Sequence, residues 1–501
     1  MPTPAGRLDL YTVAQTRTLE QETMAALGIP AFELMCRAGA AALASLRRHW
    51  PRARRVTIFC GPGNNGGDGF ILGALARDDG MHVRIVALDG AGAHGEAALA
   101  RAAWERGGGA VENWHAGDTL ADAELHVDAL YGIGLNRAVE APAAQLIECL
   151  DASPVPLLAL DVPSGLDADT GHCSGAAIHA DVTVTFIVHK RGLYTGRAAD
   201  CVGRLELATL GAPQALAAPT PADAHTLQAA CLPPRARYAN KGSNGHVLVV
   251  GGGAGMSGAA QLSGLGALRA GAGLVSLATD PAHASMLSAL HPELMAHAVP
   301  DAQALRPLLE RASVLALGPG LGRTGWSRAL WQAALDAAMP LVLDADGLNL
   351  LAQAPRRFAA PAVLTPHPGE AARLLGVATA AVEADRFAAA RELAGRFAAV
   401  VVLKGSGSLV ARADGRLDVC PWGNPGMAAG GMGDLLTGVI AAMLAQGCPP
   451  WEAARLGVGL HARAGDLAAQ AGERGLLPSD LLQPLRRLGN AVTTGAASDA
   501  G

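Results

Sequence analysis

Short runs of β-branched and aliphatic residues alternate with helical patterns through most of the chain, and many of these runs end in a glycine or a carboxylate. In the first half the runs cover residues 55–60, 82–88, 125–130 and 156–160. In the second half they cover residues 247–250, 274–278, 314–317, 341–343 and 400–403. This alternation is typical of doubly wound α/β sheets, in which ligands bind at the carboxyl ends of parallel strands. We therefore expect two such domains.

Composition and net charge disfavour several classes of binding partner and of structural framework. The 501 residues carry a net charge of −5 with no long run of one sign, which disfavours nucleic acid and anionic membranes. The eight cysteines form no Cys-x-x-Cys pair, so neither a zinc framework nor a disulfide scaffold is predicted. Residues 242–268 lack charge, but a glycine cluster at 251–258 divides them, which argues against a membrane span. Since no apolar signal core begins the chain, we expect a cytoplasmic protein.

A glycine motif over residues 61–66 follows the first of these strands. Its Gly-x-Gly-x-x-Gly spacing, with Asp89 about twenty residues on, formally matches a dinucleotide fingerprint. Inside it, however, Pro62 removes a backbone N–H, and three side chains add oxygens that suit a hydroxyl, a ribose or a hard cation better than a phosphate. These side chains are Asn64, Asn65 and Asp68. An Asx-rich turn remains an alternative interpretation.

Carboxylates stand at two further strand ends. Asp128 precedes a glycine loop that begins at Gly132, and Asp161 is followed by Ser164. The acidic stretch after Ser164 is not a calcium loop, because Ile178 stands where a bidentate Glu is required. A lone Asp at a strand end is usually a structural cap. Three neighbouring strand ends with polar groups nevertheless converge on one crevice in this fold type, which favours a functional site.

The second half ends in a glycine-dense loop, residues 424–434, that enters an apolar helical pattern. Glycines and a helix N-terminus together offer backbone N–H groups to an anion, and Asp434 at the junction is a candidate base for a hydroxyl. A helix-capping role for Asp434 is the alternative. Residues 404–408 add a cation, N–H groups and hydroxyls for a nucleotide phosphate, without Walker A spacing. With Asp344 and Asp346 able to position Mg²⁺, the set suits phosphoryl transfer to an alcohol.

Three motifs of the first half resemble the epimerase domain of NAD(P)H-hydrate repair enzymes over about residues 8–212. They are Asn-Asn-Gly-Gly-Asp-Gly at 64–69, Val-Asp-Ala-Leu-Tyr-Gly-x-Gly at 127–134 and Asp-Val-Pro-Ser-Gly-Leu at 161–166. The resemblance implies that Asp161 acts on the hydrated nucleotide and that Asn65, Asp128 and Ser164 hold a potassium ion. It also implies substrate contacts from two further segments. These are Asn64, Asn65, Gly66, Gly67 and Asp68, and Gly132, Ile133, Gly134, Leu135, Asn136, Arg137 and Ala138.

The second half resembles the ADP/ATP-dependent NAD(P)H-hydrate dehydratase domain, a ribokinase-like fold, over about residues 232–488. The motifs are Lys-Gly-Ser-Asn-Gly-His at 241–246, Gly-Pro-Gly-Leu-Gly at 318–322, Asp-Ala-Asp-Gly-Leu-Asn at 344–349, Thr-Pro-His-Pro-Gly-Glu at 365–370, Leu-Lys-Gly at 403–405, and the loop at 424–434. The resemblance implies that Ala259, Gly322, His367 and Asp434 contact the hydrate. Lys404, Gly405, Ser406, Gly407, Ser408 and Gly433 would hold the adenine nucleotide. His367 beside two prolines is otherwise a turn residue.

The hypothesis is therefore a bifunctional repair enzyme. Residues 1–212 form a Rossmann-like three-layer epimerase domain, 213–231 a Pro- and Ala-rich linker, 232–488 the ribokinase-like dehydratase domain and 489–501 a disordered tail. The first domain interconverts R and S hydrates of NADH or NADPH with K⁺, and the second dehydrates the S form with ADP and Mg²⁺, releasing AMP and phosphate. We expect small-molecule partners, NADHX, NADPHX and ADP, and a homo-oligomer.

Two rival functions remain open. A small-molecule kinase fused to a Rossmann dehydrogenase would give a stable phosphorylated product and bind oxidised NAD. A regulatory nucleotide-binding module without catalysis would keep the loops but lose the carboxylates, and all four are present. These are Asp161, Asp344, Asp346 and Asp434.

Overall fold

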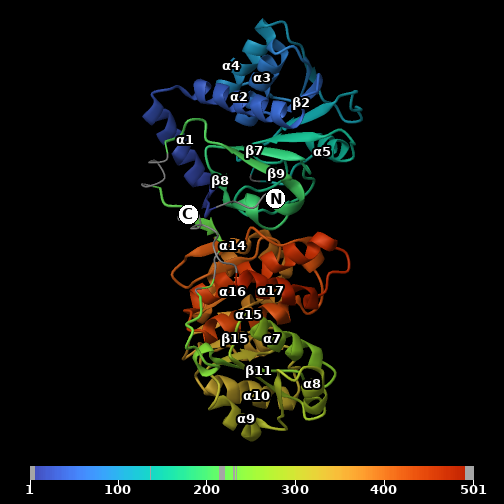
Figure 1. Ribbon diagram of the computed structural model, residues 1–501. Coiled ribbons are helices and arrows are strands. Elements are labelled where there is room, and N and C mark those ends of the chain that lie inside the picture. The colour runs from blue at the N-terminus through green and yellow to red at the C-terminus, as the bar shows by residue number, and fades with distance from the viewer. Residues whose placement is uncertain (1–5, 136, 214–219, 230–231, 233, 491–501) are drawn as a thin grey trace, which may run out of the picture. The chain divides into compact units, whose positions relative to one another are not determined.

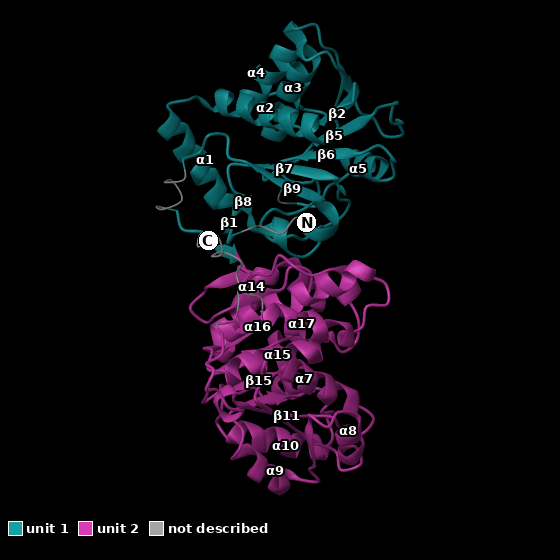
Figure 2. Cartoon of the chain, in the orientation of Figure 1, with its two compact units in different colours: residues 1–225 teal, residues 226–501 magenta. Residues whose placement is uncertain are grey.

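The computed structural model describes residues 6–135, 137–213, 220–229, 232 and 234–490. The chain forms two compact units, residues 1–225 and 226–501, which are coloured separately in Figure 2. The boundary lies within the segment for which a linker is predicted. Part of that segment, and the predicted tail from residue 491 on, lie outside the described residues.

Unit 1 is built on a parallel sheet with helices on both faces, as Figure 1 shows. The strand order is β4-β3-β2-β5-β6-β7-β9, with β2 (Arg55–Cys60), β3 (His82–Ala87), β4 (Val111–Asn113), β5 (Leu125–Ala129), β6 (Leu157–Leu160), β7 (Val182–Phe186) and β9 (Arg204–Ala208). The helices are α1 (Val13–Leu27), α2 (Ala31–His49), α3 (Asn64–Asp78), α4 (Gly95–Arg106), α5 (Ala143–Asp151) and the short α6 (Ala198–Cys201).

Alternation along the strands sends side chains into two cores. In β2, Ile58 and Cys60 join the core beneath α2 and α3, whereas Phe59 joins the core beneath α5. Leu146 and Ile147, one helical step apart on α5, close this second core. The predicted Rossmann-like three-layer sandwich is thus confirmed.

A small ladder that periodicity did not predict completes unit 1. Strand β1 (Asp9–Tyr11) pairs in parallel with the two-residue strand β8 (His189–Lys190) and antiparallel with β10 (Ala224–Thr226). Strands this short carry no readable alternation. The ladder encloses the Lys190 side chain completely, with 0 % of the residue exposed.

Unit 2 is a second doubly wound sheet, which confirms the predicted ribokinase-like α/β class. Its strands run in the order β13-β12-β11-β14-β15-β16-β17-β18-β19, parallel up to β17 and antiparallel beyond. They are β11 (His246–Val250), β12 (Leu274–Thr279), β13 (Met295–Ala298), β14 (Val314–Leu317), β15 (Leu341–Leu343), β16 (Ala362–Leu364), β17 (Val400–Leu403), β18 (Leu409–Ala411) and β19 (Leu417–Val419).

The helices of unit 2 cover both faces of this sheet. They are α7 (Ser257–Arg269), α8 (Ala284–Leu290), α9 (Ala302–Leu309), α10 (Gly325–Asp336), α11 (Asp346–Gln353), α12 (Pro368–Leu375), α13 (Thr379–Ala384), α14 (Arg386–Phe397), α15 (Met432–Ala445), α16 (Pro450–Ala468) and α17 (Leu482–Gly489). Along β11, Val247 and Val249 belong to the core around α15, while Leu248 and Val250 are buried on the opposite face.

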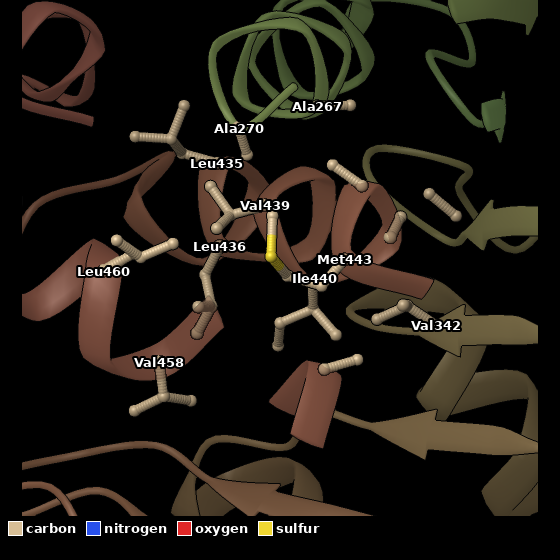
Figure 3. Close-up of a cluster of buried hydrophobic side chains, with 14 of the residues drawn as sticks. Ala267, Ala270, Val342, Leu435, Leu436, Val439, Ile440, Met443, Val458 and Leu460 are labelled. Carbon is tan, nitrogen blue, oxygen red and sulfur yellow. The ribbon is translucent and has the colours of Figure 1, made fainter. Parts of the chain in front are cut away.

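Helix α15 is the centre of this core, as Figure 3 shows. Leu435, Val439 and Ile440 are entirely buried, and a helix that is apolar all round is stable only when surrounded. Each such side chain contributes roughly 1.5–3 kcal/mol by leaving water. Gly438 lets α15 approach α7, because a Cβ placed there would lie 1.8 Å from the carbonyl oxygen of Ser263.

Among the described residues, no single helix is both long and apolar enough to cross a membrane. Helices α1 and α2 meet the length and composition requirements only as a joined pair, which is bent by 105°.

The Asx-rich turn considered for the glycine motif is not observed. Helix α3 already begins at Asn64, so Asn-Asn-Gly-Gly-Asp forms its first turns. Helix propensity is poor here, and close packing decides the structure instead. A Cβ at Gly66 would lie 2.0 Å from the carbonyl oxygen of Gly61, and one at Gly69 would lie 2.7 Å from the Ala129 side chain.

Substituting Gly438→Ala should therefore separate α7 from α15. We expect the free energy of unfolding of unit 2 to fall by about 1–3 kcal/mol, measured by urea denaturation of the full chain. Gly395→Ala is the matched control, since a Cβ there on α14 meets nothing within 4 Å. It should be neutral or stabilising by roughly 0.5–1 kcal/mol. Equal stabilities of the two variants would contradict this account of the helix contact.

Candidate active sites

The first candidate site lies at the carboxyl ends of β2, β5 and β6. Asp128 is the fourth residue of β5, Asp161 directly follows β6, and Asn65 lies in the first turn of α3 after β2. Their proximity is visible at Gly132, where a Cβ would lie 2.9 Å from Asp161 Oδ2 and 3.4 Å from the Asn65 side chain. The structure therefore brings together the strand ends that sequence reasoning connected.

Asp161 is held in an unusual conformation. Its φ is 63°, in the left-handed region that few residues other than glycine adopt. Its Oδ1 accepts a hydrogen bond of 2.6 Å from Lys190 Nζ, and its Oδ2 accepts one of 3.3 Å from the Ile133 N–H. The carboxylate thus spans from a buried cation to the glycine loop after β5.

Sequence reasoning missed Lys190. The residue lies in the two-residue strand β8, far along the chain from the motifs it serves. The chain has only three lysines among 39 lysines and arginines, at 190, 241 and 404. Two of these three, Lys190 and Lys404, pair with a carboxylate that follows a strand.

Two more acidic groups interact with Asp161. Burial raises the pKa of Asp68 well above its usual range, and the charges of Asp161 and Glu20 raise it further. Burial also raises the pKa of Glu20, with Asp161 contributing. The group therefore combines a carboxyl that favours its protonated form, Asp68, with a carboxylate that faces an ammonium, Asp161. One of them can donate a proton while the other accepts one.

Two of the three residues predicted to hold potassium are in contact. Asp128 accepts hydrogen bonds from the Ser164 N–H at 2.8 Å and from the Ser164 hydroxyl at 2.6 Å, yet burial raises its pKa to about 6. Both amide atoms of Asn65, which lies near Gly132, are buried without a hydrogen-bonding partner. A buried amide oxygen without a partner is a suitable ligand for a hard monovalent cation.

The predicted substrate loop after β5 borders a small cavity of about 60 Å³. Leu135, Arg137 and Ala138 line it, together with Gly165 and His172 from the segment after β6. Asn136 lies outside the described residues. Asp167, in the stretch that mimics a calcium loop, instead accepts N–H groups of Asp169 and Thr170 and so shapes a turn.

The second candidate site lies at the carboxyl ends of β15 and β17 and the start of α15. Lys404 Nζ lies 2.8 Å from Asp344 Oδ1 and 3.8 Å from Glu370 Oε2. Asp344 Oδ2 accepts a 2.8 Å hydrogen bond from the Thr437 hydroxyl on α15. Gly433 faces the same ammonium, since a Cβ there would lie 3.1 Å from Lys404 Nζ.

Asp434 lies beside this cluster in the first turn of α15. The N-cap of the helix is Gly431, so Asp434 does not fill the capping position that the alternative interpretation gave it. Burial raises the pKa of Asp434 to about 6, and the charges of Asp344 and Asp346 add to the effect. Such a carboxyl is a stronger base than an exposed one and is still ionised at neutral pH.

The other predicted residues of unit 2 occupy the rim of this site. The Gly322 N–H donates to Asp346 Oδ2 at 2.8 Å, and Ala259 contacts the same glycine loop near Gly320. Beyond Lys404, the segment 405–408 forms a turn closed by a 2.9 Å hydrogen bond from the Ser408 hydroxyl to the Gly405 carbonyl.

His367 has a structural role that the sequence left open. Its Nδ1 accepts the Gly369 N–H at 3.0 Å, and Glu370 Oε2 accepts the His367 N–H at 2.8 Å, which together cap α12. Its Nε2 lies 3.4 Å from Glu370 Oε1, which connects the ring to the neighbourhood of Lys404. Burial lowers the pKa of His367, with Lys404 and Arg373 contributing, so the neutral ring is favoured.

No group of three or more His, Cys, Asp or Glu side chains in the described part of the chain is arranged to hold a metal ion by itself. Mg²⁺ often needs only one or two carboxylates when nucleotide phosphates complete its shell. Asp344 and Asp346 supply the two carboxylates. The Thr437 hydroxyl donates a hydrogen bond to Asp344, and Glu370 lies near Lys404.

Comparison with known proteins matches a different family in each half of the chain. Residues 31–192 match the family described as YjeF-related protein N-terminus, and residues 247–487 match NAD(P)H-hydrate dehydratase. The chain is 45% identical over 487 residues to the bifunctional NAD(P)H-hydrate repair enzyme Nnr of Coxiella burnetii, which covers 96% of this chain and 99% of that protein. With the enzyme of the same name from Escherichia coli K12, identity is 42% over 482 residues, or 95% of this chain and 93% of that protein.

Among solved structures, the ADP/ATP-dependent NAD(P)H-hydrate dehydratase of Bacillus subtilis, co-crystallised with ATP and Mg²⁺, is 32% identical. The alignment has a TM-score of 0.47 and covers 52% of this chain and 93% of that one.

Asp434 should make stability depend on pH. Since its pKa is about 6 in the folded protein and about 4 in an unfolded chain, the folded state favours the protonated form, and unfolding free energy falls as pH rises from 4 to 6. Asp434→Asn should therefore stabilise unit 2 by roughly 1–3 kcal/mol at about pH 7 and little at about pH 4.

Urea denaturation at the two pH values measures this difference. Asp336→Asn is the control of opposite sign, because hydrogen bonds from Gln332 and Arg356 lower the pKa of Asp336. A destabilised Asp434→Asn variant at pH 7 would contradict the electrostatic assignment.

Proposed function

The chain belongs to the bifunctional NAD(P)H-hydrate repair enzymes, and we propose that each unit carries one of two reactions. Unit 1 interconverts the R and S epimers of hydrated NADH or NADPH. Unit 2 dehydrates the S epimer with consumption of ADP and release of AMP and phosphate. The supporting observation is that each unit has its own carboxylate beside a lysine: Asp161 directly after β6 in unit 1, and Asp434 in the first turn of α15 in unit 2.

In unit 2, Asp434 accepts the proton of the C6 hydroxyl. The hydroxyl oxygen attacks the terminal phosphorus of ADP, the bond from that phosphorus to the bridging oxygen breaks, and AMP leaves. The phosphate ester on C6 then leaves as inorganic phosphate while C5 loses a proton, which restores the 5,6 double bond. A carboxyl with a pKa near 6 is suited to the first step at neutral pH.

The nucleotide phosphates bind between Lys404 and the first turn of α15. The ammonium is partly buried among carboxylates, and the charges of Asp344 and Glu370 outweigh burial and raise its pKa, so it remains charged. Gly433 has no side chain to block the approach to Lys404 Nζ. Ala259, Gly322 and His367 contact the hydrate, and Gly405 to Ser408 contact the nucleotide.

Mg²⁺ would be held by Asp344 and Asp346 together with the ADP phosphates. It would neutralise charge that develops on the transferred phosphoryl group. The hydrogen bond from the Thr437 hydroxyl and the ion pair with Lys404 keep Asp344 in place.

In unit 1 the reacting carbon bears both a hydroxyl and the ring nitrogen. With a proton from Asp68 the hydroxyl leaves as water, and the nitrogen lone pair forms a C=N bond. Water then adds to the opposite face and gives its proton to Asp161, which inverts the centre and conserves all atoms. Asp68, whose pKa is raised by burial, is suited to supply the proton, and Asp161, whose Oδ1 is held by Lys190, leaves Oδ2 to accept one.

The potassium ion of unit 1 would be held by Asn65, Asp128 and Ser164. It would supply a positive charge beside the buried Asp128 and order the loop that begins at Gly132, whose residues to Ala138 contact the substrate. The unpartnered Asn65 amide supports this assignment.

One assay tests the whole proposal. The full chain is incubated with both NADHX epimers, ADP and Mg²⁺, while absorbance of the reduced nicotinamide ring and release of AMP are followed. Complete recovery of NADH with equimolar AMP is expected. A stable phosphorylated hydrate, or tight binding of oxidised NAD, would support the rival kinase–dehydrogenase fusion instead.

The first variant tests whether the activities of the two units are independent. Asp161→Ala should abolish epimerisation, a loss of at least about 100-fold in kcat, because the group that exchanges the proton is gone. Dehydration of pure S-NADHX should continue at the wild-type rate. Recovery of NADH from mixed epimers then stops when the S form is consumed, and loss of both activities would contradict the separation.

The second variant tests the base of unit 2. Asp434→Asn should lower kcat for dehydration by at least about 100-fold and leave the Kd for ADP within a few-fold, since the amide cannot accept the proton. Wild-type dehydration should also decline below about pH 6, as Asp434 becomes protonated. Near-normal turnover of Asp434→Asn would exclude it as the base.

A further inference from the structure

We propose that Lys190 is the positioning residue of the unit 1 reaction: it fixes one oxygen of Asp161 and leaves the other for the hydrated ring. The inference rests on the epimerase activity proposed above and adds a residue to it. Lys190 does not touch substrate; it acts through Asp161.

The ammonium group of Lys190 donates all of its hydrogen bonds to groups inside the protein. Its Nζ donates to Asp161 Oδ1 at 2.6 Å, to the Phe186 carbonyl at 2.7 Å and to the Thr185 hydroxyl at 3.0 Å. Three acceptors match the three protons of an ammonium group. The side chain is entirely buried, so none of these protons reaches a ligand.

The second oxygen of Asp161 faces the predicted substrate loop. Oδ2 accepts the Ile133 N–H at 3.3 Å, a long bond, and lies where a Cβ on Gly132 would come within 2.9 Å. The absence of a side chain at Gly132 keeps this approach open. Because Lys190 holds Oδ1, the carboxylate cannot rotate to exchange its two oxygens without losing the 2.6 Å ion pair.

The charges around Asp161 make the lysine necessary. Glu20 on α1 and Asp68 on α3 both interact unfavourably with an ionised Asp161. Lys190 on β8 offsets both, and Arg17 on α1 also offsets Glu20. The ladder of β1 and β8 holds this cation in place, through the register Tyr11↔Lys190. Without Lys190, the Asp161 carboxylate would lie beside Glu20 and Asp68 with no cation holding its Oδ1.

An ammonium group suits this position better than a guanidinium. The planar guanidinium of arginine cannot direct protons at three acceptors that surround one nitrogen, as the Lys190 ammonium does.

The test is Lys190→Met in the full chain, with kcat and KM for epimerisation of R-NADHX measured at neutral pH. We expect kcat to fall by at least about 100-fold with KM within about threefold, because binding contacts are untouched. Dehydration of S-NADHX by the same chain reports that unit 2 is folded, and an unchanged circular dichroism spectrum and urea transition report that unit 1 is folded. Arg52→Met, which removes an exposed cation of unit 1, is the matched control.

A second variant covers the case in which Lys190→Met does not fold. Thr185→Val removes one of the three acceptors with little change in shape and keeps both charges. It should lower kcat for epimerisation by about 3–10-fold, as expected for one lost hydrogen bond to a charged group, and leave KM unchanged. Unchanged kcat in either variant, or a loss confined to KM, would overturn the inference. If the wild-type chain itself does not epimerise NADHX, the proposed function fails and the inference with it.

Discussion

A buried ion pair between lysine and aspartate underlies both sites. Lys190 meets Asp161 at 2.6 Å and Lys404 meets Asp344 at 2.8 Å, each at the carboxyl end of a parallel strand. Removing charges from water is costly, so removing one member of such a pair typically costs about 3–5 kcal/mol. Each pair therefore fixes the carboxylate that the surrounding loops are built around.

The two ion pairs differ in whether the lysine remains accessible to a ligand. Lys190 is enclosed and holds the carboxylate proposed to react, so its effect is geometric. Lys404 remains partly accessible and holds Asp344, a neighbour of the proposed base Asp434, whose pKa is raised to about 6. The same interaction thus orients the proposed reacting carboxylate in unit 1 and leaves an accessible cation in unit 2, where we propose that phosphates bind.

Much of this architecture follows from sequence. The long strands β2, β5, β11 and β17 were predicted close to their observed bounds because they are continuous apolar runs, and the polar residues after them had to meet at the sheet edge. The short strands β8, β18 and β19 were missed, since two or three residues show no periodicity. Lys190 was missed with β8, because a position set by long-range pairing leaves no local pattern. The helical start at Asn64 was missed because close packing overrode weak helix propensity.

The backbone at Asp161 has an evolutionary consequence. Its φ of 63° disfavours most side chains by about 1 kcal/mol, and glycine would adopt it without strain. Removing the carboxylate alone, however, would leave the buried Lys190 ammonium without its partner, at a typical cost of about 3–5 kcal/mol. This cost exceeds the strain relieved, so selection for heat resistance alone would keep Asp161 wherever Lys190 is present. A lineage that no longer needed the reaction of unit 1 would therefore be expected to replace the two residues together.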